Sequence, residues 1–208
     1  MAQFLSIHPD HPQPRFIEQA AEIVRDGGLV ALPTDSAYAL GGHVGDAALL
    51  DRIRRIRGVD ERHLFTLMCR DLSEIATYAR VDNATYRLLK ATTPGSYTFI
   101  LEGTKELPRR LLHPKRKTIG LRIPDHKLTL ALLQALDEPL LTSTLIPAGD
   151  TAPLADADEI EHRLGKLIDL IIDAGPCGGE ATTVINLVGD SPELVRAGRG
   201  ALEPFGLG

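Results

Sequence analysis

Residues 29–42 have the sequence LVALPTDSAYALGG, and this stretch decides the fold class. Its first four residues form a short apolar run that Pro33 closes, as expected of a buried strand. Small hydroxyl and glycine residues follow directly, at the place where open α/β sheets bind their ligands. We therefore expect a ligand-binding turn at residues 34–36. The alternative is that these three side chains only satisfy backbone groups of the turn.

Helix and strand patterns alternate on both sides of this stretch, which indicates a single α/β domain over residues 1–208. Helices are predicted at 14–26, 46–57, 128–136 and 158–164, with short ones that open at Asp71 and at Asp82 or Asn83. Strands are predicted at 29–32, 63–69, 97–101, 118–123, 140–145, 168–172, 183–187 and near 194–197. Gly189-Asp190 indicates a hairpin, hence an antiparallel pair, so the sheet should be mixed.

The composition is typical of a protein from a reducing compartment. With 43% hydrophobic and 4% aromatic residues, the core is expected to consist mainly of Leu, Ile, Val and Ala. Cys69 and Cys177 are far apart and match neither a disulfide framework nor a zinc site. The first residues show no leader pattern, and no run approaches the roughly 20 apolar residues of a membrane span. We expect a cytoplasmic protein with no metal site and no membrane partner.

A basic segment lies within a chain whose formal net charge is −5. The negative total argues weakly against nucleic acid covering the whole surface, because such binding depends on clustered Lys and Arg. Residues 105–117 nevertheless carry six basic side chains against one acid, Glu106. A local basic patch is therefore expected there.

Four arginines lie toward the end of the second predicted helix: Arg52, Arg54, Arg55 and Arg57. The helix dipole favours cations at this end by typically ~0.3–1 kcal/mol each, and solvation explains most of them. The alternative is an anionic ligand, since a guanidinium binds phosphate or carboxylate with two parallel hydrogen bonds.

Arg122 interrupts the apolar strand 118–123, and burying an arginine without a partner costs several kcal/mol. Asp35 or an acidic substrate could be that partner, whereas an arginine on an edge strand would face water. Thr142-Ser143-Thr144 ends one strand and Thr182-Thr183 begins another, so both offer hydroxyls to a phosphate or carboxylate. Threonine is also common in strands for packing reasons alone.

Familiar catalytic motifs are absent. There is no Walker-type Gly-x-x-x-x-Gly-Lys-Thr, no His-Glu-x-x-His and no Gly-x-Ser-x-Gly, which removes the most common nucleotide-hydrolase, metalloprotease and esterase interpretations.

The segment 147–155 is rich in Gly, Ala, Pro and Asp and is predicted to be a mobile connection, either a lid or a linker.

The chain resembles the YrdC-like family over essentially its whole length, and most closely the YciO branch. Six motifs in a specific order carry the resemblance: PTDSAYALG (33–41), LFTLMCRDL (64–72), PGSYTFIL (94–101), KRKTIGLRIP (115–124), TTVI (182–185) and VRAG (195–198). The resemblance implies a twisted mixed sheet flanked by helices around a large, positively lined concave cleft. Some family members are described as binding double-stranded RNA.

The enzymes of this family are threonylcarbamoyl-AMP synthases. They join L-threonine, bicarbonate and ATP into threonylcarbamoyl-adenylate, release pyrophosphate, and so serve tRNA modification. The resemblance implies ATP with Mg²⁺ and L-threonine as ligands, and no tightly bound cofactor. It assigns to the threonine or its carbamate Thr34, Arg122 and Thr182, and to the nucleotide Arg55, Arg57, Thr142, Thr144 and Arg196.

Two positions depart from the synthase pattern. Arg55-Ile56-Arg57 stands where synthases have Lys-x-Arg, which keeps the charge but replaces a point charge by a wider fork. Thr144-Leu145-Ile146 stands where they have Ser-x-Asn, and an apolar Ile146 cannot hydrogen-bond a nucleotide. One lost transition-state donor can cost ~10²–10³ in rate.

Three hypotheses remain open from the sequence, and it identifies no catalytic residue. The first is a module that binds double-stranded RNA or tRNA by its A-form shape. Its expected phosphate contacts are Arg52, Arg54, Lys105, Arg109, Arg110, Lys115, Arg116 and Lys117. The second is an adenylating enzyme, slower than the synthases or changed in substrate. The third is a protein that binds a nucleotide or metabolite for regulation without turnover.

Overall fold

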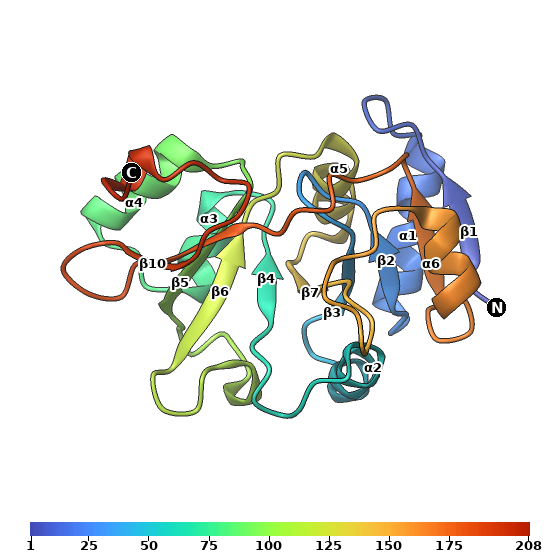
Figure 1. Ribbon diagram of the computed structural model, residues 1–208, viewed down its shortest axis with the longest axis horizontal. Helices are drawn as coiled ribbons and strands as arrows, with labels where there is room; N and C mark the ends of the chain where they lie inside the picture. The colour runs from blue at the N-terminus through green and yellow to red at the C-terminus, as the bar shows by residue number, and fades with distance from the viewer.

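The computed structural model describes residues 1–208, and a ten-stranded sheet runs through the whole molecule (Figure 1). The strand order is β1-β8-β2-β3-β7-β4-β6-β5-β9-β10. The strands are β1 (Gln3–Ser6), β2 (Val30–Leu32), β3 (Ala39–His43), β4 (Thr66–Met68), β5 (Tyr97–Glu102), β6 (Thr118–Arg122), β7 (Leu140–Thr144), β8 (Leu170–Asp173), β9 (Thr183–Asn186) and β10 (Glu193–Arg196). Parallel pairs such as β4–β6 stand beside antiparallel pairs such as β5–β6, which confirms the mixed α/β class.

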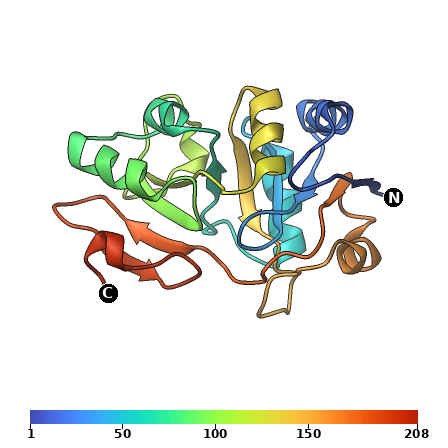
Figure 2. The same ribbon diagram turned by 90° about the horizontal axis from the view of Figure 1, so that it is seen from above.

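Helices cover both faces of this sheet. They are α1 (Pro14–Arg25), α2 (Ala47–Arg57), α3 (Leu72–Tyr78), α4 (Asn83–Thr92), α5 (Lys127–Leu136) and α6 (Ala157–Leu164), with short 3-10 turns η1 (Arg109–Leu111) and η2 (Glu203–Phe205). Figure 2 shows α1, α3 and α5 on one side of the sheet and α6 on the other. None of these helices has the length and apolar character that crossing a bilayer requires.

Strand β2 packs against helices on both faces of the sheet. All three of its residues are buried, as the apolar run predicts. Val30 and Leu32 pack in one apolar cluster with α1 and α5, whereas Ala31 packs in the other cluster with Leu49 and Ile53 of α2. Because successive side chains of a strand point to opposite faces, a strand buried on both sides reads as a continuous apolar run.

The ends of α2 follow directly from its sequence. The Asp46 carboxylate accepts hydrogen bonds from the backbone N–H groups of Ala48 and Leu49, at 2.8 and 3.3 Å. Gly58 closes the helix in the left-handed conformation, at φ 62°, which glycine adopts without a steric cost. These caps fix where Arg57, the last residue of the helix, enters the interior.

Two strands lie where none is predicted, β1 at the edge of the sheet and β3 in its middle. Strand β3 pairs antiparallel with β2, so residues 33–38 are a hairpin turn between adjacent strands. Gly42 of β3 lies beneath α2, and a Cβ there would come within 2.7 Å of the Leu49 side chain. The glycines that weaken the strand signal in the sequence therefore allow a helix to pack closely against the strand.

Backbone hydrogen bonds and an ion pair fix the segment 147–155 to the rest of the fold. The backbone N–H of Ala148 donates to the Ile56 carbonyl at 2.9 Å, and that of Leu154 donates to the Leu145 carbonyl at 3.0 Å. Asp150 forms an ion pair with Arg163 of α6 at 2.8 Å. These contacts restrain the connection that the composition predicts to be mobile.

Candidate functional site

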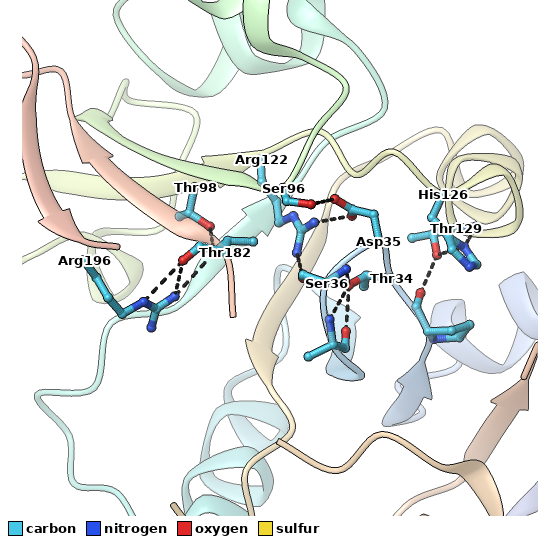
Figure 3. Close-up of polar contacts among 12 residues, drawn as sticks. Thr34, Asp35, Ser36, Ser96, Thr98, Arg122, His126, Thr129, Thr182 and Arg196 are labelled. Atoms are coloured by element: carbon cyan, nitrogen blue, oxygen red, sulfur yellow. Dashed lines mark hydrogen bonds and ion pairs between the residues drawn. The ribbon is translucent and has the colours of Figure 1, made fainter. Parts of the chain in front are cut away.

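The hairpin turn after β2 uses its own hydroxyl groups. The buried Thr34 hydroxyl donates to the Ala37 carbonyl at 2.6 Å and accepts from the backbone N–H groups of Ser36 and Ala37, at 3.1 and 3.2 Å. Thr34 therefore satisfies turn backbone groups, as the alternative to a ligand-binding role requires. The Ser36 hydroxyl is 3.0 Å from the Thr34 hydroxyl and also accepts a hydrogen bond from Arg122 (Figure 3).

Arg122 and Asp35 form a buried ion pair beside this turn. Arg122 Nη2 donates to Asp35 Oδ1 at 2.5 Å, and Nη1 donates to the Ser36 hydroxyl at 3.2 Å. Ser96 donates to the second Asp35 oxygen at 2.6 Å (Figure 3). Strand β6 lies between β4 and β5, so Arg122 is not on an edge strand. Burial lowers the pKa of Arg122 and Asp35 opposes this effect, while the buried Nε–H has no partner.

Thr182 and Arg196 meet at the start of the C-terminal hairpin. The Thr182 and Thr98 hydroxyls are 2.8 Å apart, and Arg196 donates to the Thr182 carbonyl from Nη2 at 2.9 Å (Figure 3). Gly198 permits this approach, since a Cβ there would come within 2.3 Å of the Ala181 carbonyl oxygen. The guanidinium of Arg196 is thereby anchored by backbone at one side.

A third cluster joins Arg57, His63 and Ser143. Arg57 Nη1 donates to the Ser143 hydroxyl at 2.7 Å and lies 3.0 Å from His63 Nε2, which is 2.9 Å from Ser143 Oγ. Burial lowers the pKa of His63 to about 4, and the charge of Arg57 contributes to this shift. His63 is absent from the residues predicted as a site, and Ser143 is predicted only as one hydroxyl of the segment 142–144. The sequence pattern that indicates the direction of Ser143 is the alternation of side chains along a strand. Ser143 lies between Leu141 and Leu145, which face α2.

These clusters open onto one cleft of about 320 Å³. Its walls carry three arginines, Arg57, Arg116 and Arg196, and two histidines, but no aspartate or glutamate. An inner recess of about 30 Å³ adjoins it and shares several lining residues with it. Hydroxyl groups and Arg122 line this recess. A cleft with cations and no carboxylate in a protein of net charge −5 is suited to an anion.

The mouth of the cleft is apolar. Leu64 and Val195 contribute to its wall although they are 49% and 57% exposed. Ile146 and Val184 line it further in. Exposed apolar side chains beside converging cations fit a ligand with both a charged group and a flat or apolar part.

The residues predicted for the nucleotide reach this cleft only in part. Arg57, Thr144 and Arg196 line it, and Thr142 lines the inner recess, where its hydroxyl already donates to the Thr66 carbonyl at 2.9 Å. Arg55 is exposed and does not line the cleft, because it lies about 160° around α2 from Arg57.

The residues predicted to contact RNA are divided among several places. Arg52 pairs with Asp169 at 2.7 Å, and Arg54 pairs with Asp51 and lies over the Phe65 ring. Arg110 donates to the Gly45 carbonyl, Lys115 is exposed, and Arg116 lines the cleft. Lys105, Arg109 and Lys117 line a second groove together with Arg80.

Comparison with known proteins gives consistent matches over the whole chain. A family model named Sua5_yciO_yrdC, with the description "Telomere recombination", matches residues 22–198. YciO of Escherichia coli (strain K12) is 55% identical over 205 residues, which cover 99% of this chain and 100% of that protein. The crystal structure of E. coli YciO matches with a TM-score of 0.95 over the same shares of the two chains.

More distant matches are synthases. Threonylcarbamoyl-AMP synthase of Bacillus subtilis (strain 168) is 28% identical over 88% of this chain and 53% of the synthase. The structure of P. abyssi Sua5 complexed with L-threonine is 25% identical with a TM-score of 0.86, over 95% of this chain and 58% of the other. The chain thus spans a little over half the length of these two proteins.

Proposed function

Because this chain belongs to the Sua5–YciO–YrdC family, we propose that its cleft binds a nucleotide together with a small carboxylic acid. The observation that carries the proposal is the cleft wall, in which Arg57, Arg116 and Arg196 converge without any carboxylate. Three cations close together repel one another, and phosphate oxygens relieve that repulsion through charge-assisted hydrogen bonds. The phosphates would lie between Arg57 and Arg196, with the apolar mouth against the base.

The inner recess is proposed to hold the carboxylic acid. Arg122 lines it with a buried Nε–H that has no partner, and an unpaired buried donor costs about 1–3 kcal/mol. Thr98, Thr182 and Ser36 supply hydroxyls around the same space. The recess has room for about one water molecule, so it would take the carboxylate end of a small acid while the rest of that acid lies in the adjoining cleft. L-threonine, which the P. abyssi Sua5 structure contains, is such an acid.

Adenylate formation is the chemistry that these two half-sites would support. A carboxylate or carbamate oxygen attacks the α-phosphorus of ATP, the bond to the bridging oxygen breaks, and pyrophosphate leaves. Arginines beside the phosphates would stabilise the charge that develops there. Mg²⁺ would have to arrive on the nucleotide phosphates, because no three His, Cys, Asp or Glu residues lie together as a metal site. With Ile146 where synthases have asparagine, we expect slow turnover.

Calorimetry with ATP and with L-threonine tests the proposal. ATP should bind, and Arg57→Ala or Arg196→Ala should weaken binding by about 10-fold or more, since each removes a hydrogen bond to a charged group. Arg55→Ala is the matched control on the far side of α2 and should bind ATP like the parent protein. Absence of ATP binding, or equal effects of all three variants, would refute the proposal.

Product analysis separates an enzyme from a regulator. The protein is incubated with ATP, bicarbonate and a panel of amino acids, and the products are read by mass spectrometry. Pyrophosphate release with an amino acid adduct identifies an adenylating enzyme and its acceptor. ATP binding without product supports the non-catalytic alternative.

Binding of RNA phosphates is a second candidate function, which the groove outside the cleft favours. Arg80, Lys105, Arg109 and Lys117 line it, with Glu102 as the one acid. Lys105→Glu combined with Arg109→Glu should weaken binding of double-stranded RNA, and binding by the parent should fall steeply between about 50 and 200 mM salt. Affinity that does not depend on salt would exclude this function.

A further inference from the structure

One contact in the cleft constrains the protonation state of a histidine. Arg57 comes from the end of α2, His63 from the loop that follows, and Ser143 from β7. Arg57 Nη1 is 3.0 Å from His63 Nε2, and Ser143 Oγ is 2.9 Å from the same nitrogen. A guanidinium only donates hydrogen bonds, so His63 Nε2 must accept. The imidazole is therefore neutral, with its proton on Nδ1.

This cluster resembles the serine–histidine pair of nucleophilic enzymes only in its distances. Arg57 donates to the Ser143 oxygen at 2.7 Å, which withdraws electron density from the atom that would have to attack. Burial and the neighbouring cations also hold the pKa of His63 at about 4, too low for an effective general base near neutral pH. The arrangement is instead suited to responding to negative charge.

We propose that His63 is a positioning residue of the anion site, which holds Arg57 and Ser143 in the free cleft and, in mildly acidic solution, takes up a proton when a phosphate-like dianion binds beside Arg57. The proposal rests on the anion-binding function proposed above. The ligand class is a tetrahedral oxyanion, free or as part of a nucleotide. Once protonated, Nε2 becomes a donor, so Arg57 Nη1 is released to bind the anion.

Most of the charges around His63 favour its neutral form in the free cleft. Arg57 and Arg54 of α2 lower its pKa beyond the effect of burial, and Asp60 of the following loop opposes them. Across the cleft lie Arg116, Arg196 and His113, with no carboxylate among the lining residues. A dianion beside Arg57 offsets the two cations that destabilise imidazolium. The pKa of His63 must then rise.

Histidine Cε1–H NMR of the full chain tests the proposal with sulfate as the probe, because sulfate remains a dianion throughout the titration. The apparent pKa of His63 should rise by about one to two units at saturating sulfate. Sulfate affinity should increase as pH falls, by about tenfold per unit of that rise. At a fixed pH, the addition of sulfate should leave the signal of exposed His11 in place, so that signal is an internal reference.

Two variants make the result specific. His63→Gln keeps an acceptor for Arg57 but cannot titrate at this position, so its sulfate affinity should depend less on pH than that of the parent. The variant also identifies the His63 signal. Ser143→Ala should keep the rise, because it leaves the contact between Arg57 and His63. A purely structural His63 would give the same pH profile in the parent and in His63→Gln, which would overturn the proposal.

The remaining outcomes separate this inference from the proposed function. Sulfate that binds in an Arg57-dependent manner without moving the pKa of His63 overturns the inference and leaves nucleotide binding intact. Binding of ATP without any binding of sulfate also overturns it. Failure of ATP to bind refutes the proposed function, whereas a sulfate-linked rise in the pKa of His63 would still support the proton uptake.

Discussion

Arg122 and Asp35 form an ion pair across the middle of the sheet, 2.5 Å apart, with side chains only 7% and 8% exposed. Arg122 lies at the end of β6, and Asp35 lies in the turn that joins β2 to β3. Strands β7 and β4 separate β3 from β6 in the sheet. The pair therefore joins the two halves of the molecule at the inner end of the cleft.

Asp35→Ala should strongly destabilise the protein. The substitution leaves the Arg122 guanidinium buried without its counter-ion, which typically costs about 3–5 kcal/mol in the free energy of unfolding. Urea denaturation followed by circular dichroism measures the loss. The control is Asp10→Ala, which breaks the exposed pair with Lys127 and should change stability little, because solvent screens exposed ion pairs. Equal costs for the two variants would show that the buried pair does not contribute as described.

Thr34→Ala tests whether this hydroxyl belongs to the turn or to a ligand. The Thr34 hydroxyl makes three hydrogen bonds with turn backbone groups and one with the Ser36 hydroxyl. Their loss predicts a decrease of about 1–3 kcal/mol in unfolding free energy, and Thr34→Ser should restore most of it. Denaturation without ligand gives both values. An unchanged stability combined with lost L-threonine binding would instead make Thr34 a ligand contact.

Local features account for the parts of the fold that the sequence predicts. The cap of α2 at Asp46, its end at Gly58 and the hairpin at Gly189 depend on neighbouring residues, and all three occur as predicted. The need of Arg122 for a partner is also predictable, because a buried charge must be paired. Asp35 is one of the two partners that this reasoning allows, and the structure selects it.

Features that depend on contacts between residues far apart in the sequence are not predictable from local patterns. Strand β3 contains Gly41 and Gly42, and it forms because β2 and β7 pair with it on either side. The contacts of Ser143 with Arg57 and His63 join residues 86 and 80 positions apart. Nothing local in the chain fixes these distances, although strand alternation places Ser143 on the face toward α2.

His63 should make stability depend on pH. Its pKa is 6.5 ordinarily and about 4 in the folded protein, so between these values the unfolded chain binds more protons. The free energy of unfolding therefore falls as pH falls through this range. At about 1.4 kcal/mol per unit, reduced by solvent screening at a partly exposed site, the loss should be about 1–3 kcal/mol.

Urea denaturation of the parent and of His63→Gln, at about pH 7 and about pH 4.5, isolates this effect. The parent should lose more stability than the variant over this interval. Other groups, such as the half-buried His126, titrate in both proteins and cancel in the difference. An equal loss in both proteins would contradict the low pKa of His63.

Ile146→Asn should raise adenylating activity, because it supplies the amide that synthases of this family are expected to carry at the nucleotide. Ile146 lines the cleft beside Thr144, so the new side chain would reach the same space. A transition-state donor contributes about 10²–10³ in rate, and recovery of about 10-fold or more in pyrophosphate release from ATP, bicarbonate and L-threonine is expected.

Ile146→Leu is the size-matched control and should leave the rate unchanged. Arg55→Lys alone should have no effect, since Arg55 lies outside the cleft. Background release by the double variant Ile146→Asn, Arg55→Lys would show that this wall does not contact the nucleotide.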